Sequence, residues 1–451
     1  MSEPVIQSQT RGLESARQLS GASWRSALPQ QVLTWLPLSL FFPVGVMYAG
    51  VLLFALSLLI SGDYARKWLR VRSHPMLPPV LALTVLSIVV ALFQSRPAGE
   101  FWSSFWHYQT YLFLLPFLAV GSGLGLGTGT GTAAAANQWQ ARAQLVFFGG
   151  AIYASSLFYL AAAGLLPTTT LFRSYVVYEG NKSILLGILL AIAAGWMLHA
   201  WRWHKNHTLL RALALAYVVI ALLLFAKTRT ASLIFILLCG LMLLRNVTLN
   251  WRSMLALSVL GLLLAGGVKY VADLPPPLTC LTKVMVAEQH LNPAAILLQR
   301  GVCTVHQIRN FNQGKQIGED GMRLEIYKIT GQIIAEKPWS GHGIGNWLSL
   351  YHERAQGMMS QAMTTPHNDY LLYATELGAF GVFALLWIWC RQLLLARKML
   401  AGEHQERAML LAMLGLTMMV GGMFNAILRD GVFGMAFMIL LAIPLAGVTK
   451  K

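Results

Sequence analysis

The chain has 451 residues, of which 56% are hydrophobic and only 11% are charged. A soluble domain carries about a quarter charged residues, so this composition excludes an ordinary soluble protein and indicates an integral membrane protein. The formal net charge of +17 would suit a nucleic-acid partner. The cations, however, lie in loops between apolar segments, so we expect contacts with anionic membrane lipid and no nucleic acid.

The first 28 residues are polar and rich in Ser and Gln. They lack the apolar core and small-residue cleavage site of a signal peptide. Residues 1–28 are therefore predicted to be a disordered cytoplasmic tail.

Apolar runs long enough to approach a membrane crossing fill most of the remaining chain. They predict an all-α polytopic membrane protein with about twelve transmembrane helices, nine in residues 29–272 and three in residues 367–451. The expected spans are 31–44, 46–61, 77–94, 107–125, 144–166, 183–201, 210–226, 230–245, 254–272, 370–396, 408–427 and 431–447.

The loops alternate in charge along the chain. Loops on one side carry most of the Arg and Lys residues, and by the positive-inside rule this side and both termini are cytoplasmic. The long polar segment 273–366 then lies outside, as a single large periplasmic loop that contains short helices.

Four cysteines divide between the two environments. Cys239 and Cys390 fall within expected spans and suit core packing. Cys280 and Cys303 lie in the outer loop, where an oxidising compartment permits a disulfide between them. Two free buried thiols are the alternative, and neither cysteine belongs to a Cys-x-x-Cys pair that would indicate a metal site.

Positive charge at an outer turn opposes the topology rule and needs a reason. The sequence Lys227-Thr228-Arg229-Thr230 places two cations and two hydroxyls in one turn between apolar spans. The pattern favours an anion site at headgroup depth, because a guanidinium offers a planar fork to phosphate oxygens. A pair of interfacial cations that extend to water is the alternative.

The outer loop is predicted to contain a helix capped by Asp320 and ended by Pro338. Its apolar residues recur at helical spacing, so one face should pack against something apolar. Arg323 lies in the first turn and off this stripe, where it opposes the helix dipole. It is either an anion-binding residue or a solvated surface residue. The stripe comprises Met322, Ile326, Ile329 and Ile333.

Three alternating glycines occur in Pro338–Asn346. They would let backbone amides point at a ligand, or they form a tight connector.

His367 is the best candidate for chemistry. With Thr365 as N-cap and Pro366 as the first helical residue, His367 would lie in the first turn of a membrane helix. The positive helix end would keep the ring neutral and able to act as a general base. A capping or packing histidine is the alternative. Zinc, P-loop and paired-acid signatures are lacking, so the sequence predicts no metal and no cofactor.

The order of four motifs resembles the O-antigen ligase and polymerase superfamily of Gram-negative bacteria. The motifs are the Thr-Arg-Thr turn at 228–230, Arg323, the Pro-x-x-Gly-x-Gly-x-Gly-Asn stretch at 338–346 and His367-Asn368-Asp369-Tyr370-Leu371. The layout of spans around one dominant loop is also similar to the ligase.

The resemblance implies an inner-membrane glycosyltransferase whose active site faces the periplasm. Its donor would be an undecaprenyl-pyrophosphate-linked glycan and its acceptor a hydroxyl of lipid A-core. His367 would deprotonate the acceptor, and Arg229 and Arg323 would hold the pyrophosphate without a metal. Lys182 and Asn368 are further substrate-binding candidates, although Lys182 could equally be an end-cap.

Three alternatives remain open at this point. An O-antigen polymerase has similar loops, and a protein O-oligosaccharyltransferase uses the same donor. A transporter of polyprenyl-linked glycan would explain the many spans, but it predicts internally repeated halves and charged or broken helices at mid-membrane.

Overall fold

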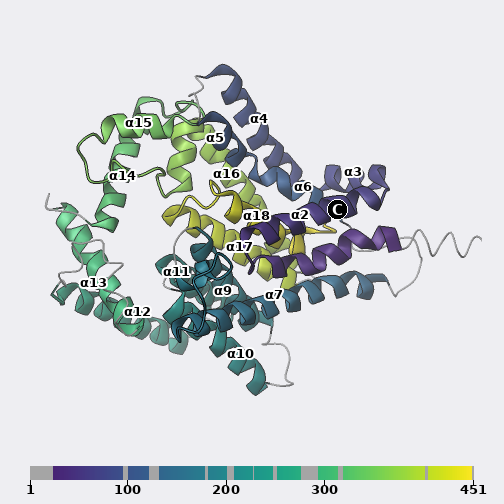
Figure 1. Ribbon diagram of the computed structural model, residues 1–451, viewed down its shortest axis with the longest axis horizontal. Coiled ribbons are helices and arrows are strands. Elements are labelled where there is room, and N and C mark those ends of the chain that lie inside the picture. The colour runs from purple at the N-terminus through teal and green to yellow at the C-terminus, as the bar shows by residue number, and fades with distance from the viewer. Residues whose placement is uncertain are drawn as a thin grey trace, which may run out of the picture.

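The computed structural model describes residues 24–94, 100–120, 132–177, 181–200, 208–226, 228–246, 251–275, 293–312, 318–401 and 405–448. These residues form helices joined by turns, and within them no strand occurs. The prediction of an all-α protein is therefore confirmed over the described part of the chain (Figure 1).

The elements follow one another in this order. After an unlabelled helix over 24–39 come α2 Val44–Ile60, α3 Tyr64–Ser73, α4 Leu77–Phe93, α5 Phe101–Tyr108, the 3-10 turn η1 Thr110–Phe113, α6 Leu114–Leu118, α7 Thr132–Ala162, α8 Arg173–Val176, α9 Asn181–Ala200, α10 Thr208–Ile220, the π-helical η3 Ala221–Phe225, α11 Arg229–Asn246, α12 Trp251–Asp273, α13 Pro293–Asn312, α14 Glu319–Glu336, α15 Trp347–Arg354, α16 Asp369–Leu400, α17 Gln405–Phe424 and α18 Gly431–Leu445.

Helix 24–39 begins within the segment 1–28 that was expected to be a disordered tail, and residues 1–23 lie outside the described residues.

The expected span at 107–125 is wrong as one continuous helix, because α5, η1 and α6 divide it. Two polar residues at the break explain the division. Gln109 donates to the Ser87 hydroxyl on α4 at 2.7 Å, and the Thr110 hydroxyl donates back to the His107 carbonyl. Pro116 further removes a backbone donor.

Five described helices are long and apolar enough to cross a membrane, and a sixth is added if α2 and α3, bent by 117°, count as one span. The chain is accordingly a multi-pass membrane protein. Helix α4, most of α11 and α18 are apolar but shorter. The number of twelve crossings, and the periplasmic side of the 273–366 segment, remain predictions.

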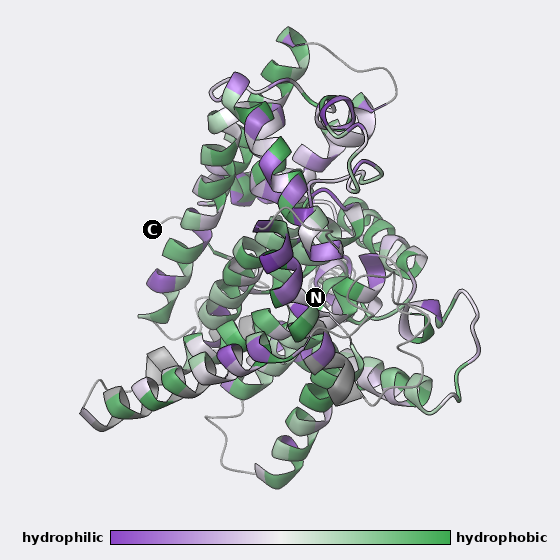
Figure 2. Ribbon diagram, turned by 90° about the vertical axis from the view of Figure 1, so that its left-hand side faces the viewer, coloured by the Kyte–Doolittle hydropathy of each residue, from purple (hydrophilic) through white to green (hydrophobic). Residues whose placement is uncertain are grey.

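Helix α9 lies at the centre of the apolar core, and most of its residues are buried from end to end. Two of its glycines allow α11 to approach closely. A Cβ on Gly187 would meet the Thr228 side chain, and one on Gly195 would meet Leu238. Small residues of this kind are the usual means of close packing between membrane helices. Hydrophobic residues predominate along most of the helices in Figure 2.

The segment between α12 and α16 contains α13, α14 and α15, of which α14 and α15 pack beside the beginning of α16 (Figure 1). The predicted apolar stripe of α14 is confirmed for Ile326, Ile329 and Ile333, which are buried in one cluster with Trp347 of α15 and Leu372 of α16. Met322, the first residue of the stripe, is half-buried and lies outside this cluster. This small second core fixes α14 relative to the start of α16. Asp320, Arg323 and Tyr327 lie on a neighbouring face of the same helix.

Candidate functional site

Helix α16 begins three residues later than the sequence suggested. Asn368, not Thr365, is the N-cap, and its side chain accepts a hydrogen bond from the Leu371 amide at 3.0 Å. The Thr365 hydroxyl instead accepts from the His367 amide in the preceding turn. His367 therefore lies just outside the helix, with a left-handed φ of 50°. Such backbone strain in a non-glycine residue is frequent at functional sites.

Two arginines from distant parts of the chain lie near enough to the half-buried His367 ring for their charges to act on it. Burial, followed by the charges of Arg323 and Arg429, lowers the pKa of His367 to about 4. A neutral ring at pH 7 was expected, but the reason given for it was wrong, because His367 does not lie in the first turn of α16. Burial and two neighbouring guanidinium groups keep the ring unprotonated.

The backbone around His367 is held by α14 and by the end of α17. The Tyr327 hydroxyl donates to the Met423 carbonyl at 3.1 Å and to the His367 carbonyl at 3.4 Å. The Asn368 side chain also donates to the Met423 carbonyl at 3.0 Å. Asn368 thus has two structural roles, as a cap and as a link to α17.

Arg229, the first residue of α11, is paired with Asp320. Its Nη1 donates to the Asp320 carboxylate at 2.5 Å and also to the Thr304 hydroxyl of α13. Asp320 was expected to cap α14, but this was wrong: Gly318 is the N-cap, and the Asp320 carboxylate faces Arg229. Burial raises the pKa of Asp320, but Arg229, Thr304 and the charge of Arg323 outweigh it and lower the pKa overall.

Arg323 connects the two halves of this site. Its guanidinium is close enough for its charge to act on both Asp320 and His367. Asp320, Arg323 and Tyr327 are spaced so that they lie along one face of α14. The structure therefore brings Arg323 near His367 and near Asp320, the partner of Arg229.

Lys182 does not belong to this cluster. Its ammonium donates to the Leu40 carbonyl at the end of helix 24–39, as an end-cap does. Lys227, the other cation of the predicted outer turn, lies outside the described residues.

Cys303 is disulfide-bonded, while Cys239 and Cys390 are free. Cys280 lies outside the described residues, so its pairing with Cys303 stays a prediction.

The glycine-rich stretch 338–346 is a tight connector that docks onto α16. The amides of His342 and Gly343 donate to the Thr375 and Glu376 carbonyls at 2.8 and 3.1 Å. These two amides are therefore hydrogen-bonded within the protein and do not point at a ligand. Docking is possible because α16 is kinked at Gly378, whose φ is 70°.

Gly378→Ala is expected to destabilise the protein by about 2 kcal/mol or more, from a left-handed backbone and overpacking combined. A Cβ there would lie 2.1 Å from the Trp339 carbonyl oxygen, a backbone atom that cannot move aside cheaply. Thermal unfolding in detergent measures the change. The matched control is Gly331→Ala in the middle of α14, where a Cβ meets nothing within 4 Å and should stabilise by up to about 1 kcal/mol. Equal effects of the two substitutions would contradict the docking.

Two functional candidates at this site escaped the sequence reasoning. Arg429 follows α17 and was not singled out from the sequence. The sequence feature that could have identified Arg429 is the one that identified Arg229, a positive charge on the side where the topology disfavours it.

Asp369 is fully buried at the start of α16, and the Leu428 amide donates to its carboxylate at 3.2 Å. Both carboxylate oxygens lie within 3.3 Å of this amide, so the buried carboxylate holds the turn at Leu428.

Asp369→Ala is expected to lower stability by about 1 to 3 kcal/mol, because it leaves the buried Leu428 amide without its acceptor. Asp369→Asn keeps one acceptor oxygen and should cost less. The midpoints of thermal unfolding show which of the two variants is less stable. An alanine variant as stable as the asparagine variant would show that the carboxylate does not hold the turn.

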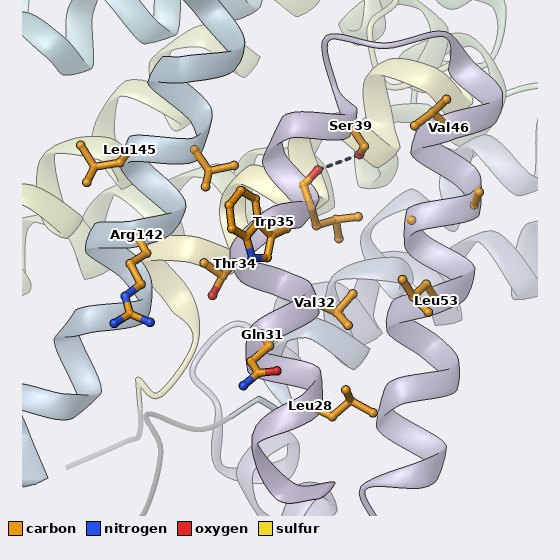
Figure 3. Close-up of a pocket in the computed structure, with 14 residues that line it drawn as sticks. Leu28, Gln31, Val32, Thr34, Trp35, Ser39, Val46, Leu53, Arg142 and Leu145 are labelled. Atoms are coloured by element: carbon orange, nitrogen blue, oxygen red, sulfur yellow. Dashed lines mark hydrogen bonds between the residues drawn. The ribbon is translucent and has the colours of Figure 1, made fainter. Parts of the chain in front are cut away.

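A pocket with a volume of about 830 Å³ lies elsewhere, between helix 24–39, α2 and α7 (Figure 3). Its walls are mostly apolar, with exposed Trp35 at the middle and Arg142 on the α7 side. The residues that line it include none of those around His367. The pocket is therefore separate from the candidate site around His367.

Among the described residues, no group of three His, Cys, Asp or Glu side chains is arranged to hold a metal ion.

Residues 214–386 match the model of a protein family described as O-antigen ligase. The matched segment includes Arg229, Arg323, the glycine-rich stretch and His367, and it ends before Arg429. A search of curated proteins finds no match to the chain.

Proposed function

Because the chain belongs to the O-antigen ligase family through residues 214–386, we propose that it is a glycosyltransferase that moves O-antigen glycan from undecaprenyl diphosphate to a hydroxyl of lipid A-core. The family indicates ligase- or polymerase-type activity in a membrane enzyme. Lipid A-core as acceptor, undecaprenyl diphosphate as carrier and the periplasmic face of the inner membrane are parts of the proposal.

The observation that carries the proposal is the position of Arg323, whose charge acts on both Asp320 beside Arg229 and His367. Cations and a neutral imidazole in one region suit a reaction in which a diphosphate leaves and a hydroxyl attacks. Guanidinium forks bind phosphate oxygens strongly. A guanidinium has five N–H donors, so Arg229 can hold Asp320 and a phosphate oxygen together.

The proposed step is a direct displacement at the anomeric carbon of the donor sugar. A ring nitrogen of His367 accepts the proton of the acceptor hydroxyl, and the freed oxygen forms a bond to that carbon. The bond from the carbon to the diphosphate oxygen breaks, and its electron pair stays on the diphosphate. Arg229 and Arg323 stabilise the additional negative charge. The products are the glycosylated acceptor, undecaprenyl diphosphate and a protonated His367.

The arginines supply the positive charge that a metal would otherwise bring to the leaving group. We therefore propose a metal-independent reaction, with no cofactor. The surplus of cations in the loops on the opposite side supports a periplasmic position for this region.

A competition among acceptors tests the proposal. Purified protein in nanodiscs receives labelled donor with lipid A-core, with a second donor molecule or with an acceptor protein. Labelled lipid A-core is the expected product. Longer donor chains would indicate the polymerase, and labelled protein would indicate the protein O-oligosaccharyltransferase. Donor that crosses the bilayer of a vesicle without transfer would indicate the transporter.

A further inference from the structure

Arg429 lies in the turn between α17 and α18, beside the segment that leads to His367. Its Nη1 donates to the Thr364 carbonyl, three residues before the histidine. Its charge acts on His367 and on His107 of α5, so the guanidinium lies where α5 and the start of α16 meet. It also acts on the buried Glu376 and Tyr108, which are bonded to each other at 2.7 Å.

The backbone of this turn is fixed on both sides of Arg429. The preceding Leu428 amide donates to the buried carboxylate of Asp369, as described above. Asp430, the next residue, caps α18 through the Val432 amide at 2.7 Å and accepts a hydrogen bond from Asn181 of α9. A flexible surface arginine needs none of these constraints. The constraints fix the backbone of the turn from which the Arg429 guanidinium reaches the Thr364 carbonyl and acts on His367 by its charge.

We propose that Arg429 is a third cation for the donor diphosphate, and that the charge of the bound donor is what makes His367 an effective base. The inference rests on the proposed function and adds to it a residue outside the matched family segment. In the empty site, Arg323 and Arg429 oppose the arrival of a proton on the ring. A diphosphate between these cations neutralises them, so the same ring then accepts a proton readily.

The charges that face His367 support this direction. Arg323 and the Tyr327 hydroxyl come from α14, and Arg429 comes from the α17–α18 turn. The nearby carboxylates are engaged elsewhere: Asp320 with Arg229, and Asp369 with the Leu428 amide of the turn. A ring with a pKa of about 4 is a weak base near pH 7, where catalysis is best served by a pKa close to the working pH. Donor binding therefore has to raise it.

This arrangement has a chemical consequence. Before the donor binds, the ring does not deprotonate an acceptor or a water molecule efficiently. After the donor binds, the ring can accept a proton and the diphosphate leaving group is in the site at the same time. The binding of the correct substrate thus completes the catalytic site.

Two measurements on the full-length protein in nanodiscs test the proposal. The first is the affinity for undecaprenyl diphosphate, which carries no glycan and so does not depend on transfer. Arg429→Gln should weaken it by ~10- to 100-fold, and Arg429→Lys by less, because a lysine keeps the charge and loses the fork. Arg173→Gln on α8, a cation elsewhere on the expected outer side, is the control and should bind like the wild type.

The second measurement is the pH dependence of transfer. In the wild type, the acidic limb of the kcat profile should lie at higher pH than that of kcat/KM for the donor, because kcat reports the donor-bound enzyme and kcat/KM the free enzyme. In Arg429→Gln the kcat/KM limb should move to higher pH, since one opposing charge is gone. A merely structural arginine would lower activity without moving this limb.

Unchanged affinity together with unchanged acidic limbs in Arg429→Gln would overturn the proposal. If that variant does not fold, Arg429→Lys still tests the affinity for undecaprenyl diphosphate, with a smaller expected change. A wild type that binds undecaprenyl diphosphate but transfers no glycan would instead contradict the proposed function. The affinity series would still decide the binding role of Arg429.

Discussion

His367→Ala is expected to lower kcat for glycan transfer by about 10²- to 10⁴-fold, the usual contribution of a positioned general base. The alanine variant cannot accept the proton of the acceptor hydroxyl, while the arginines that bind the diphosphate remain. Affinity for undecaprenyl diphosphate should therefore stay within a few-fold of the wild type. Transfer assays and binding measurements on the same preparation separate the two quantities.

The matched control is His352→Ala, which changes a half-buried histidine of α15 whose ring contacts the Met363 carbonyl. It should transfer glycan at nearly the wild-type rate if it folds. Equal losses in the two variants would mean that histidines of this segment support its fold and that His367 has no special role.

Arg323→Gln is expected to lower kcat/KM by about 10²- to 10³-fold, which is typical for the loss of one group that stabilises a developing negative charge. Arg323→Lys should recover part of the loss, because it restores the charge without the planar fork. The glutamine variant should also show its acidic limb at higher pH, since one cation near His367 is removed. Steady-state kinetics across pH measures both effects.

Arg354→Gln is the control for a surface arginine of the same segment. Arg354 forms an ion pair with Glu336 at 2.8 Å, and partly exposed pairs of this kind contribute little to stability. A similar loss of activity in Arg354→Gln and Arg323→Gln would contradict a specific role for Arg323 in the diphosphate site.

The sequence predicted the positions of most helices well, because apolar runs and the polar residues that end them are local properties. The stripe of isoleucines on α14 was predicted for the same reason. The break between α5 and α6 was not predicted, because it depends on the contact of Gln109 with Ser87 on another helix. Hydropathy alone treats that segment as one span.

The site was predicted in part. Unusual cations and a histidine at the start of a span were visible in the sequence, and they led to Arg229, Arg323 and His367. The partner of Arg229 lies 91 residues away, and the Thr364 carbonyl that Arg429 contacts is 65 residues from it. Asp320 was given a local role as a cap because the sequence shows near neighbours and not these distant ones. The buried Asp369 was missed for the same reason.

The most direct test of the account is a single-turnover reaction of the reconstituted protein with purified glycan-linked donor and lipid A-core, in EDTA. The account predicts that each glycan joined to lipid A-core releases one undecaprenyl diphosphate, and that His367→Ala binds the donor without releasing it. Mass spectrometry of both products gives the ratio. Transfer at the wild-type rate by His367→Ala, or a wild type that is active only after a divalent metal is restored, would contradict the account.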